Sequence, residues 1–104
     1  MNNCGIYCIE NLLNNKKYIG QSEELDVRLA KHFWLLNKNK HDNRHLQGAF
    51  NIDGIDNFSF YVLEECECIS KILDEKETYY MDLYKTLDPR FGYNIHRPEL
   101  NSKN

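Results

Sequence analysis

The segment GIYCIENLLNNKKYIGQ, residues 5–21, limits most strongly how this chain can fold. Residues 4–10 alternate with the period of two that is typical of strands, with Ile6, Cys8 and Glu10 on one side and Tyr7 and Ile9 on the other. Residues 16–21 are interpreted as a second strand. Asn14 and Asn15 lie between them, and asparagine tolerates the positive φ that a tight hairpin turn requires. We therefore expect the chain to open with an antiparallel β-hairpin.

The register of this hairpin decides how Tyr7 and Tyr18 are related. Residues that face each other across an antiparallel pair have a constant index sum, and a two- or four-residue loop centred on 12–15 makes that sum odd. The indices of the two tyrosines also add to an odd number, so both side chains should project from the same face of the sheet. Ordinary cross-strand aromatic packing would place them there as well.

The rest of the chain predicts three helices and one further strand. A helix over 23–37 should begin after Ser22, a favourable N-cap, and its apolar residues recur at helical spacing: Leu25, Leu29, Phe33 and Leu36. A shorter helix over 43–52 should end before Gly54, and the aromatic residues of 58–65 favour a strand. The order β-β-α-α-β-α predicts an α/β (α+β) fold with a small antiparallel sheet flanked by helices.

The last helix is expected over 71–86, with Ser70 as its cap and Asp88-Pro89 ending it. Its inward residues are predicted to be Ile72, Leu73, Tyr80 and Leu83. The segment FGYNI should be a turn that leads into a short extended piece. We expect one domain over 1–96, as suits a chain of 104 residues, and a loose tail over 97–104.

Charge limits the kinds of partner. The net charge is −3, whereas a protein that binds nucleic acid over its whole surface is usually basic. Basic residues nevertheless gather in one region of the sequence: Arg28, Lys31, Lys38, Lys40 and Arg44, with His32, His41 and His45 among them. Solvated helix faces would explain this cluster, and a local patch for nucleic acid is the alternative.

The four cysteines, at positions 4, 8, 66 and 68, have spacings that depart from those of structural zinc sites. We expect reduced, partly buried thiols in an intracellular protein, whether of the cytoplasm or the nucleus. No apolar run approaches the roughly 20 residues that a membrane helix needs, and no secretory leader is evident.

Glu77 is the least ordinary residue of the predicted helices. Its helical neighbours are apolar or aromatic: Leu73, Tyr80, Met81 and Tyr84. A carboxylate on such a face is expensive unless it is paired, hydrogen-bonded or bound to a metal. The ordinary explanation is that Glu77 extends out to solvent or forms a structural ion pair with Lys85 or Arg28, and a functional carboxylate is the alternative. Arg28 and His32, four residues apart on one helix, share a face at the edge of its apolar stripe.

Taken together, these residues resemble the GIY-YIG nuclease family. The sequence has GIY at 5–7 and YIG at 18–20, followed in order by Arg28, His32, Glu77 and Asn94. The resemblance covers 4–96 and is strongest to the catalytic domains of phage-type and intron-homing endonucleases. It implies a three-stranded antiparallel sheet flanked by helices, and hydrolysis of DNA phosphodiester bonds with one divalent metal, Mg²⁺ or Mn²⁺.

The same resemblance implies a role for each residue. Glu77 is expected to be the metal ligand, Arg28 to hold the scissile phosphate, and Tyr7 to deprotonate or orient the attacking water. An unperturbed tyrosine pKa near 10 makes Tyr7 a poor base at neutral pH, so neighbouring charge must lower it. Tyr18 and His32 would complete the hydrogen-bond network, in which His32 could relay a proton, and Asn94 would brace the site.

The expected DNA surface comprises Arg28, Lys31, Lys38, Lys40, His41 and Arg44. Because the chain is acidic overall, we expect weak, salt-sensitive binding to DNA. Specificity would then come from a separate DNA-binding domain, a partner protein or a homodimer. Two other functions compete with the nuclease: a non-cleaving module that binds DNA or a protein, and a zinc-stabilised structural domain built on the four cysteines.

Overall fold

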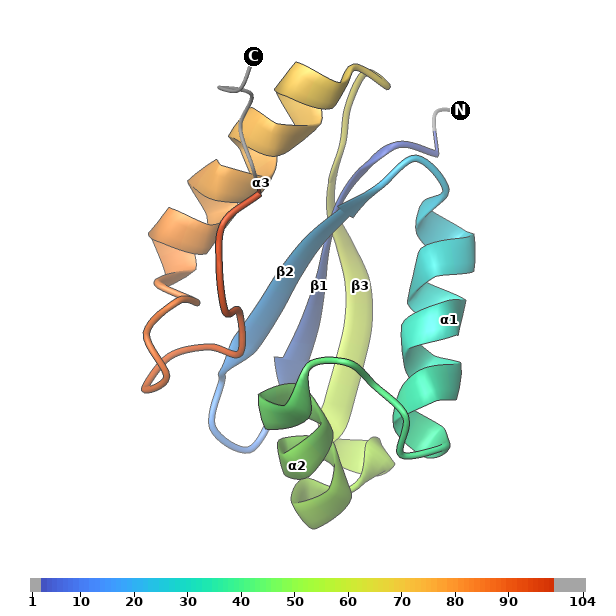
Figure 1. The fold of residues 1–104 in the computed structure, drawn as a ribbon, viewed down its shortest axis with the longest axis vertical. Coiled ribbons are helices and arrows are strands. Elements are labelled where there is room, and N and C mark those ends of the chain that lie inside the picture. Colours follow the sequence, from blue (N-terminus) through green and yellow to red (C-terminus); the bar gives the residue numbers. More distant parts are fainter. Residues whose placement is uncertain (1–2, 99–104) are drawn as a thin grey trace.

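A computed structural model describes residues 3–98. Its centre is a three-stranded antiparallel sheet of β1 (Gly5–Asn11), β2 (Lys17–Ser22) and β3 (Phe58–Glu65), in the order β2-β1-β3 (Figure 1). β1 is therefore the central strand, and β2 is an edge strand. The hairpin predicted from the opening segment is confirmed, with Asn15 in the left-handed region at φ 65°.

Three α-helices and one turn of 3₁₀ helix connect and cover the strands. They are α1 (Leu25–Asn37), α2 (Arg44–Asp53), the short η1 (Ile55–Asn57) and α3 (Ser70–Tyr84). The order β-β-α-α-β-α is confirmed, as is the α+β class. The carboxamide of Asn43 caps α2 by accepting a hydrogen bond from the Leu46 N–H, and Gly54, at φ 87°, ends it.

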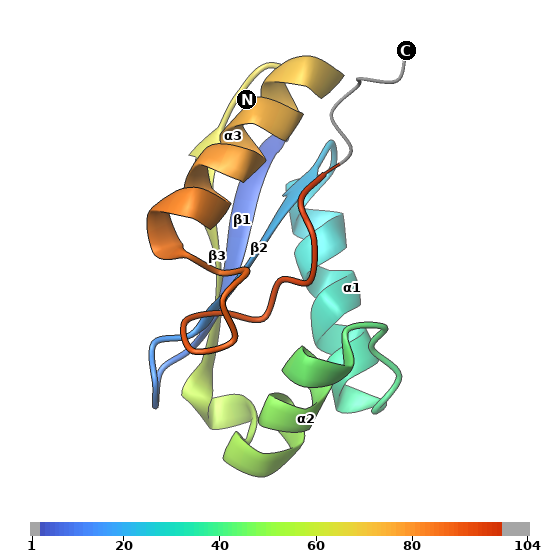
Figure 2. The same ribbon diagram turned by 60° about the vertical axis from the view of Figure 1, so that its left-hand side comes forward.

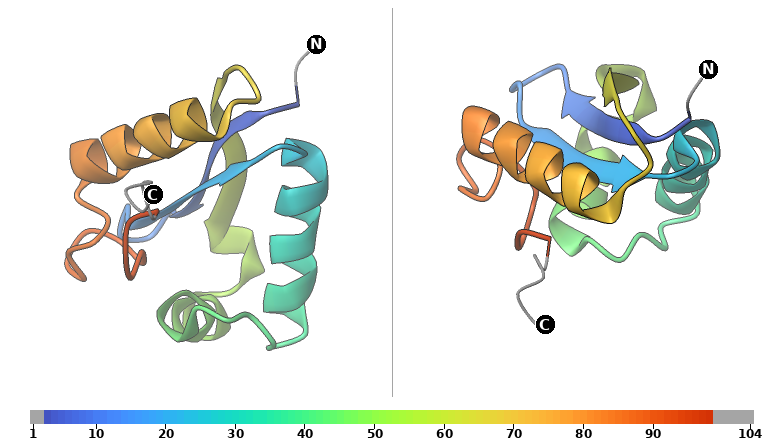
Figure 3. Two further views of the ribbon diagram at one scale, coloured as in Figure 1. Left: turned by 45° about the horizontal axis from the view of Figure 1, so that its top comes forward. Right: turned by 90° about the horizontal axis from the view of Figure 1, so that it is seen from above.

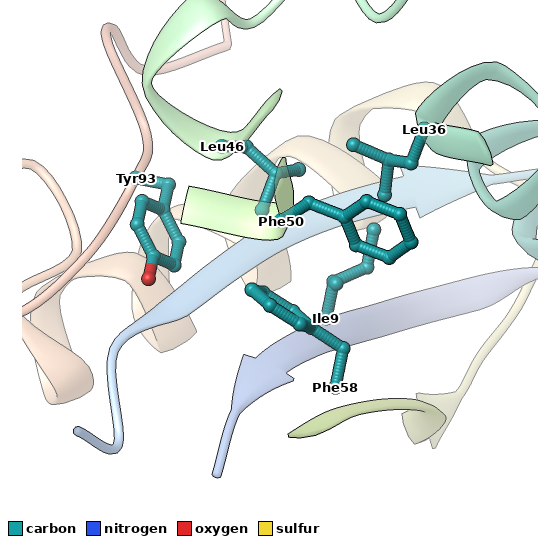
Figure 4. Packing of buried hydrophobic residues seen from close by; sticks show 6 residues of the cluster. All are labelled: Ile9, Leu36, Leu46, Phe50, Phe58 and Tyr93. Carbon is teal, nitrogen blue, oxygen red and sulfur yellow. The ribbon is translucent and has the colours of Figure 1, made fainter. Parts of the chain in front are cut away.

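The sheet separates two hydrophobic clusters. On one face, α1 and α2 pack over a cluster shown in Figure 4: Ile9, Leu36, Leu46, Phe50, Phe58 and Tyr93. On the other face, α3 covers a second cluster: Ile6, Cys8, Ile19, Leu73 and Met81. Figure 3 shows α3 and the α1–α2 layer on opposite sides of the strands. Alternate residues of β1 feed alternate clusters, as the pleat of a strand requires.

The segment after α3 returns along the free edge of β2, as Figure 2 shows. Lys17 and Gly92 form a parallel bridge, and the Tyr93 N–H donates to the Lys17 carbonyl over 2.9 Å. This is the short extended piece predicted for FGYNI. A Cβ at Gly92 would lie 2.3 Å from the Thr86 Cα, so only glycine fits where the segment doubles back.

The ends of two helices differ from the prediction. Ser22 is not the N-cap of α1, because it is the last residue of β2 and its hydroxyl accepts a hydrogen bond from the Glu24 N–H. α3 ends at Tyr84, not at residue 86, because Lys85 adopts a left-handed conformation at φ 57° ahead of the Asp88-Pro89 pair. Helical spacing alone places neither boundary.

Two residues predicted to point inward lie at the surface. Leu83 is 53% exposed, because Met81 and not Leu83 fills the second cluster. Phe33 is 43% exposed, although its ring contacts the edge of Phe60. The helix faces are thus rotated slightly from those predicted by spacing.

The cysteine prediction is corrected in part. Cys4 and Cys68 form a disulfide, so these two are not reduced thiols. The pairing of β1 with β3 brings them together, since the Cys66 N–H donates to the Cys4 carbonyl over 3.0 Å. Cys8 is a buried free thiol. Residues 3–98 contain no group of three potential metal-binding side chains, which argues against a zinc centre built on the cysteines.

Within the same residues, no helix has the length and apolar character needed to cross a bilayer.

Candidate active site

An open pocket of about 1080 Å³ lies at the free edge of β2. Side chains reach it from both layers of the fold and from the returning C-terminal segment: Tyr18, Gln21, Arg28, Lys31, His32, His41, Glu77, Asn94 and Arg97. Five of the six predicted catalytic residues thus line one pocket. The sixth, Tyr7, is 1% exposed and lies beneath it. An edge strand allows this arrangement, because residues of opposite faces can meet around it.

Tyr7 and Tyr18 project from the same face of the sheet, as the register argument predicts. Tyr7 pairs with Gly20 and Ile9 pairs with Tyr18, so the index sum is odd and the two tyrosines are diagonal neighbours. A Cβ at Gly20 would lie 2.3 Å from the hydroxyl oxygen of Tyr7. Only glycine at position 20 lets the phenol cross β2 toward the pocket.

The other glycine of the opening segment serves the sheet. A Cβ at Gly5 would lie 2.1 Å from the Glu64 carbonyl oxygen on β3. Gly5 therefore lets β3 approach the start of β1. The glycine of each tripeptide thus has a physical cause, which is close backbone approach at Gly5 and passage of the Tyr7 ring at Gly20.

Two histidines extend the network from Tyr7 into the α1–α2 layer. The Tyr7 hydroxyl oxygen and His32 Nε2 are 2.6 Å apart, and His32 Nδ1 and His41 Nε2 are 2.7 Å apart. Burial lowers the pKa of His32 to about 3, with the charges of His41, Arg28 and Lys31 acting in the same direction. Burial also lowers the pKa of His41. Both imidazoles are therefore neutral at neutral pH.

The tyrosines are not ready bases. Burial raises the pKa of Tyr7 and that of Tyr18 above the ordinary tyrosine value, and the Glu77 carboxylate adds to both effects. Arg28 acts in the opposite direction on both phenols. Either phenolate would therefore need additional positive charge in the pocket in order to form.

Glu77 reaches the pocket from α3, on the far side of the sheet from the tyrosines. Gln21 Nε2 donates to Glu77 Oε1 over 2.8 Å and to Asp74 Oδ1 over 2.7 Å. Burial raises the pKa of Glu77 to about 7, the Gln21 hydrogen bond lowers it, and the Asp74 charge raises it. Within residues 3–98, no salt bridge involves Glu77, so neither Lys85 nor Arg28 is its structural partner.

Arg28 and Lys31 are exposed on α1 and line the pocket. Lys38, Lys40 and Arg44 are exposed but do not line it. His41, grouped with these residues in the predicted DNA surface, is only 5% exposed. Its ring stacks on that of His32, with 4.9 Å between centroids, so His41 belongs to the interior of the site.

Asn94 holds the returning segment against the edge of β2. Its Oδ1 accepts from the Ile19 N–H and its Nδ2 donates to the Ile19 carbonyl, both over 2.9 Å. The side-chain amide thus takes the place of a backbone partner at the edge strand. This geometry suits the bracing role that the sequence resemblance implies.

Sequence reasoning missed several residues of the site. Gln21, which bridges two carboxylates, carries no signal beyond its place directly after YIG. Asn43 was predicted only to lie within a helix, and it contacts His41 through its backbone. Arg97 falls in the predicted tail, yet it lines the pocket and forms an ion pair with Asp82. Residues 99–104 of that tail lie outside the described residues.

Comparison with known proteins decides the family. The protein-family model described as the GIY-YIG catalytic domain matches residues 3–94 of this sequence. This chain belongs to the GIY-YIG family. The resemblance drawn from the two tripeptides is thus confirmed, and Gly5, Tyr7 and Gly20 show why the motif that names the family has its form.

Two curated relatives are similar to most of this chain. The "Intron-associated endonuclease 1" of Enterobacteria phage T4 is 37% identical over 92 residues, which are 88% of this chain and 36% of that protein. The "Probable intron-encoded endonuclease 1" of Neurospora crassa is 36% identical over 89 residues, which are 86% of this chain and 27% of that protein. The chain thus spans about a third of the length of these relatives.

Solved structures confirm the fold. Two structures of the catalytic domain of the homing endonuclease I-TevI each superpose with a TM-score of 0.82 at 33% sequence identity. One alignment covers 93% of this chain and 96% of that domain, and the other covers 89% and 98%. The chain therefore matches nearly a whole GIY-YIG catalytic domain and a minor part of the curated proteins.

Proposed function

We propose that this GIY-YIG domain is a DNA endonuclease that hydrolyses phosphodiester bonds with the help of one divalent metal ion. The names of its relatives, which are intron endonucleases, support the reaction class. The observation that carries the proposal is Glu77. It is a half-buried carboxylate without a salt-bridge partner among residues 3–98, at the wall of an open pocket that also holds Arg28 and Lys31.

The chemistry of Glu77 fits a hard divalent cation. Mg²⁺ keeps several waters and takes one or two protein carboxylates, together with phosphate oxygens of the substrate. Glu77 supplies one such carboxylate, and its raised pKa shows that the surroundings leave the negative charge poorly compensated. A bound Mg²⁺ or Mn²⁺ would polarise a phosphoryl oxygen and stabilise developing charge.

Arg28 is the proposed phosphate ligand. Its guanidinium is exposed and lines the pocket, so a DNA phosphate can reach it. A guanidinium presents a planar set of donors that matches phosphate oxygens, and it stabilises charge that develops in the transition state. Lys31 lies one helical turn away on the same rim, and the exposed Lys38, Lys40 and Arg44 would extend contact along the DNA backbone.

Tyr7 is the proposed group that activates or orients the attacking water, and Tyr18 is the second candidate. Tyr7 has the direct hydrogen bond to His32, whereas Tyr18 lines the pocket itself. The raised pKa of both phenols requires the positive charge of Arg28 and of the metal before either can take a proton from water. Asn94 keeps the edge of β2 in place beside them.

Selection of a DNA site is proposed to lie outside this domain. The chain carries a net charge of −3 and offers only a local basic rim, which favours weak, salt-dependent binding. The relatives are about three times as long as the matched part. A further DNA-binding region, a partner protein or a homodimer would supply specificity.

The test is a plasmid-nicking assay. Supercoiled DNA is incubated with the protein and Mg²⁺ or Mn²⁺, with and without a chelator, beside a panel of linear, nicked, branched and single-stranded substrates. Metal-dependent cleavage is expected. Binding to DNA without cleavage under any metal would instead favour the non-cleaving module.

Arg28→Ala is the first variant for this assay. Loss of a preorganised donor that contacts transition-state charge lowers rates by about 10²–10³-fold. Lys38→Ala is the matched control, since it removes an exposed charge outside the pocket and should chiefly weaken DNA binding slightly and make its salt dependence shallower. Equal effects of the two variants would contradict a specific role for Arg28.

A further inference from the structure

The hydrogen-bond chain behind Tyr7 begins at a backbone group whose direction is not in doubt. The Asn43 N–H can only donate, and it lies 3.0 Å from His41 Nδ1. That nitrogen must therefore present its lone pair. A neutral imidazole carries one N–H and one lone pair, so His41 carries its hydrogen on Nε2.

The same logic passes to the next ring. His41 Nε2–H points to His32 Nδ1 over 2.7 Å, so this nitrogen too must accept. His32 then carries its hydrogen on Nε2, which lies 2.6 Å from the Tyr7 hydroxyl oxygen. In this series of hydrogen bonds the Tyr7 oxygen accepts from His32, and the hydrogen of the Tyr7 hydroxyl points away from His32. Adding a proton to either imidazole would set two N–H groups against each other.

The origin of the chain is fixed by three parts of the fold. The Asn43 side chain caps α2 and donates to the Tyr93 carbonyl over 2.7 Å. The His41 N–H donates to Gln47 Oε1 over 3.0 Å, and Gln47 Nε2 reaches the Leu36 carbonyl at the end of α1 over 3.0 Å. The loop between α1 and α2 therefore cannot shift the backbone of His41 or Asn43 without breaking several buried hydrogen bonds.

We infer that His41 is a positioning residue that fixes the tautomer of His32, so that His32 donates a hydrogen bond from Nε2 to the Tyr7 oxygen. This inference deepens the proposed nuclease function and rests on it for its catalytic meaning. A tyrosine oxygen with a fixed donor can hold negative charge, which a neighbouring acceptor would oppose. His32 in this tautomer cannot take the Tyr7 proton and instead stabilises the phenolate.

This assignment differs from the role of proton relay that the sequence suggests for His32. A relay would need an unprotonated His32 Nε2. The hydrogen of His32 would then lie on Nδ1, directly opposite the His41 Nε2–H. The buried Asn43 N–H would then lose its acceptor, or His41 would have to rotate. Leaving a buried donor unsatisfied costs about 1–3 kcal/mol, so the relay tautomer is disfavoured.

Nuclear magnetic resonance measures the tautomers directly. Protein labelled with ¹⁵N at histidine is studied at neutral pH without DNA or metal, with two-bond ¹H–¹⁵N correlations for each ring. The expected result is a protonated Nε2 and an unprotonated Nδ1 in both His32 and His41. A protonated Nδ1 in His32, or a mixture of tautomers, would overturn the inference.

Two variants of His41 then test its control over His32. His41→Phe keeps a planar ring but removes the donor, so His32 should lose its single tautomer. His41→Gln returns an N–H near the position of Nε2, and His32 should regain the Nε2–H form. An unchanged His32 in His41→Phe would refute the positioning role; if that variant does not fold, the His32 tautomer in His41→Gln decides in its place. His45→Gln, an exposed substitution, is the control.

Cleavage supplies the second measurement. Loss of the hydrogen-bond partner of a metal ligand commonly lowers activity by about 10–100-fold, and we expect an effect of the same order for the outer partner of Tyr7. His41→Phe should lower kcat by this order with little change in KM, and His41→Gln should recover part of the loss. Normal kcat in His41→Phe would also refute the inference. Absence of cleavage by the wild-type protein would contradict the proposed nuclease instead, and the tautomer measurement would stand by itself.

Discussion

Tyr7, His32 and His41 lie on one face of the sheet, whereas Glu77 and Gln21 lie on the other, and the two groups differ in how their polar atoms are satisfied. On the α1–α2 side every step of the chain is a short hydrogen bond between neutral groups. On the α3 side a carboxylate with a raised pKa faces a pocket. The hydrogen bonds of the first side are made within the protein, whereas the second side leaves a carboxylate facing an open pocket.

The difference explains why the pocket lies at the edge of β2. A central strand would separate its two faces, whereas the side chains of an edge strand can meet around it. Tyr18 and Gln21 leave β2 toward opposite faces, and both line the pocket. Residues from both faces of the sheet therefore meet in one pocket.

Removing the Glu77 carboxylate on the α3 side should have the largest effect on DNA cleavage. Glu77→Gln keeps the size of the side chain and an acceptor for Gln21 but cannot offer a carboxylate to a divalent cation. We expect cleavage of supercoiled DNA to fall by at least about 100-fold, as for loss of a group that holds transition-state charge. Normal cleavage by this variant would sink the assignment of the metal ligand.

Glu75→Gln is the matched control for that experiment. Glu75 is exposed on the same helix and lies two residues away. It should cleave DNA at the wild-type rate and unfold at the wild-type temperature. An equal loss of cleavage in both variants would mean that any change of charge on α3 lowers activity. The loss in Glu77→Gln could then not be assigned to metal binding.

Gly20→Ala breaks the rigid side. The added Cβ would lie 2.3 Å from the Tyr7 ring and hydroxyl, so the phenol or β2 must move. Overpacking of this kind costs about 1–3 kcal/mol, and displacement of the Tyr7 oxygen should also slow cleavage. Urea denaturation and the nicking assay measure the two effects.

Gly48→Ala is the contrasting substitution. Gly48 lies inside α2 and a Cβ there meets no atom within 4 Å. Alanine is favoured over glycine in a helix interior by about 1 kcal/mol, so this variant should be more stable than wild type. If both glycine variants were destabilised alike, steric passage of Tyr7 would not be the reason for Gly20.

The sequence sufficed for the fold because its signals were local. Alternation predicted the hairpin, and index parity placed Tyr7 and Tyr18 on one face without any knowledge of the rest. The Glu77 anomaly was visible because helical spacing identifies apolar neighbours. Ser22 and Leu83 were misplaced because cap and face depend on packing of α1 and α3 against the sheet, which local pattern does not contain.

The hidden half of the site arises from contacts distant in the chain or made by the backbone. Gln21 becomes informative only once α3 lies beside β2, more than fifty residues later in the chain. His41 joins His32 because the loop before α2 folds back on α1. The Asn43 N–H that orients both rings is a main-chain group, and the identity of a side chain cannot reveal it.

The proposed affinity of Glu77 for a divalent metal should depend on pH. Because the pKa of Glu77 is raised to about 7, protons compete with Mg²⁺ or Mn²⁺ at this carboxylate near neutrality. Affinity should rise by about tenfold per pH unit below that value and level off above it. Asp74→Asn removes the nearby charge that raises the Glu77 pKa, so the levelling-off should move to lower pH. Calorimetric titration with Mn²⁺ measures both curves, and a flat wild-type profile would contradict the assignment.

The smallest expected effect is an increase in the stability of Glu77→Gln, the variant that is expected to lose cleavage. The folded protein holds the Glu77 proton up to a pKa of about 7, whereas the ordinary value is 4.5. Stability therefore falls as pH rises between these values, since the unfolded chain gives up this proton first. Glu77→Gln has no such proton, so its gain in unfolding free energy over wild type should be near zero at pH 4 and reach roughly 1–3 kcal/mol by pH 8.

Urea denaturation of both proteins at the two pH values, with Glu75→Gln alongside, measures this gain. A variant equally stable or less stable at pH 8 would show that the protein itself already satisfies the Glu77 carboxylate, and the contrast between the two sides of the site would then be wrong.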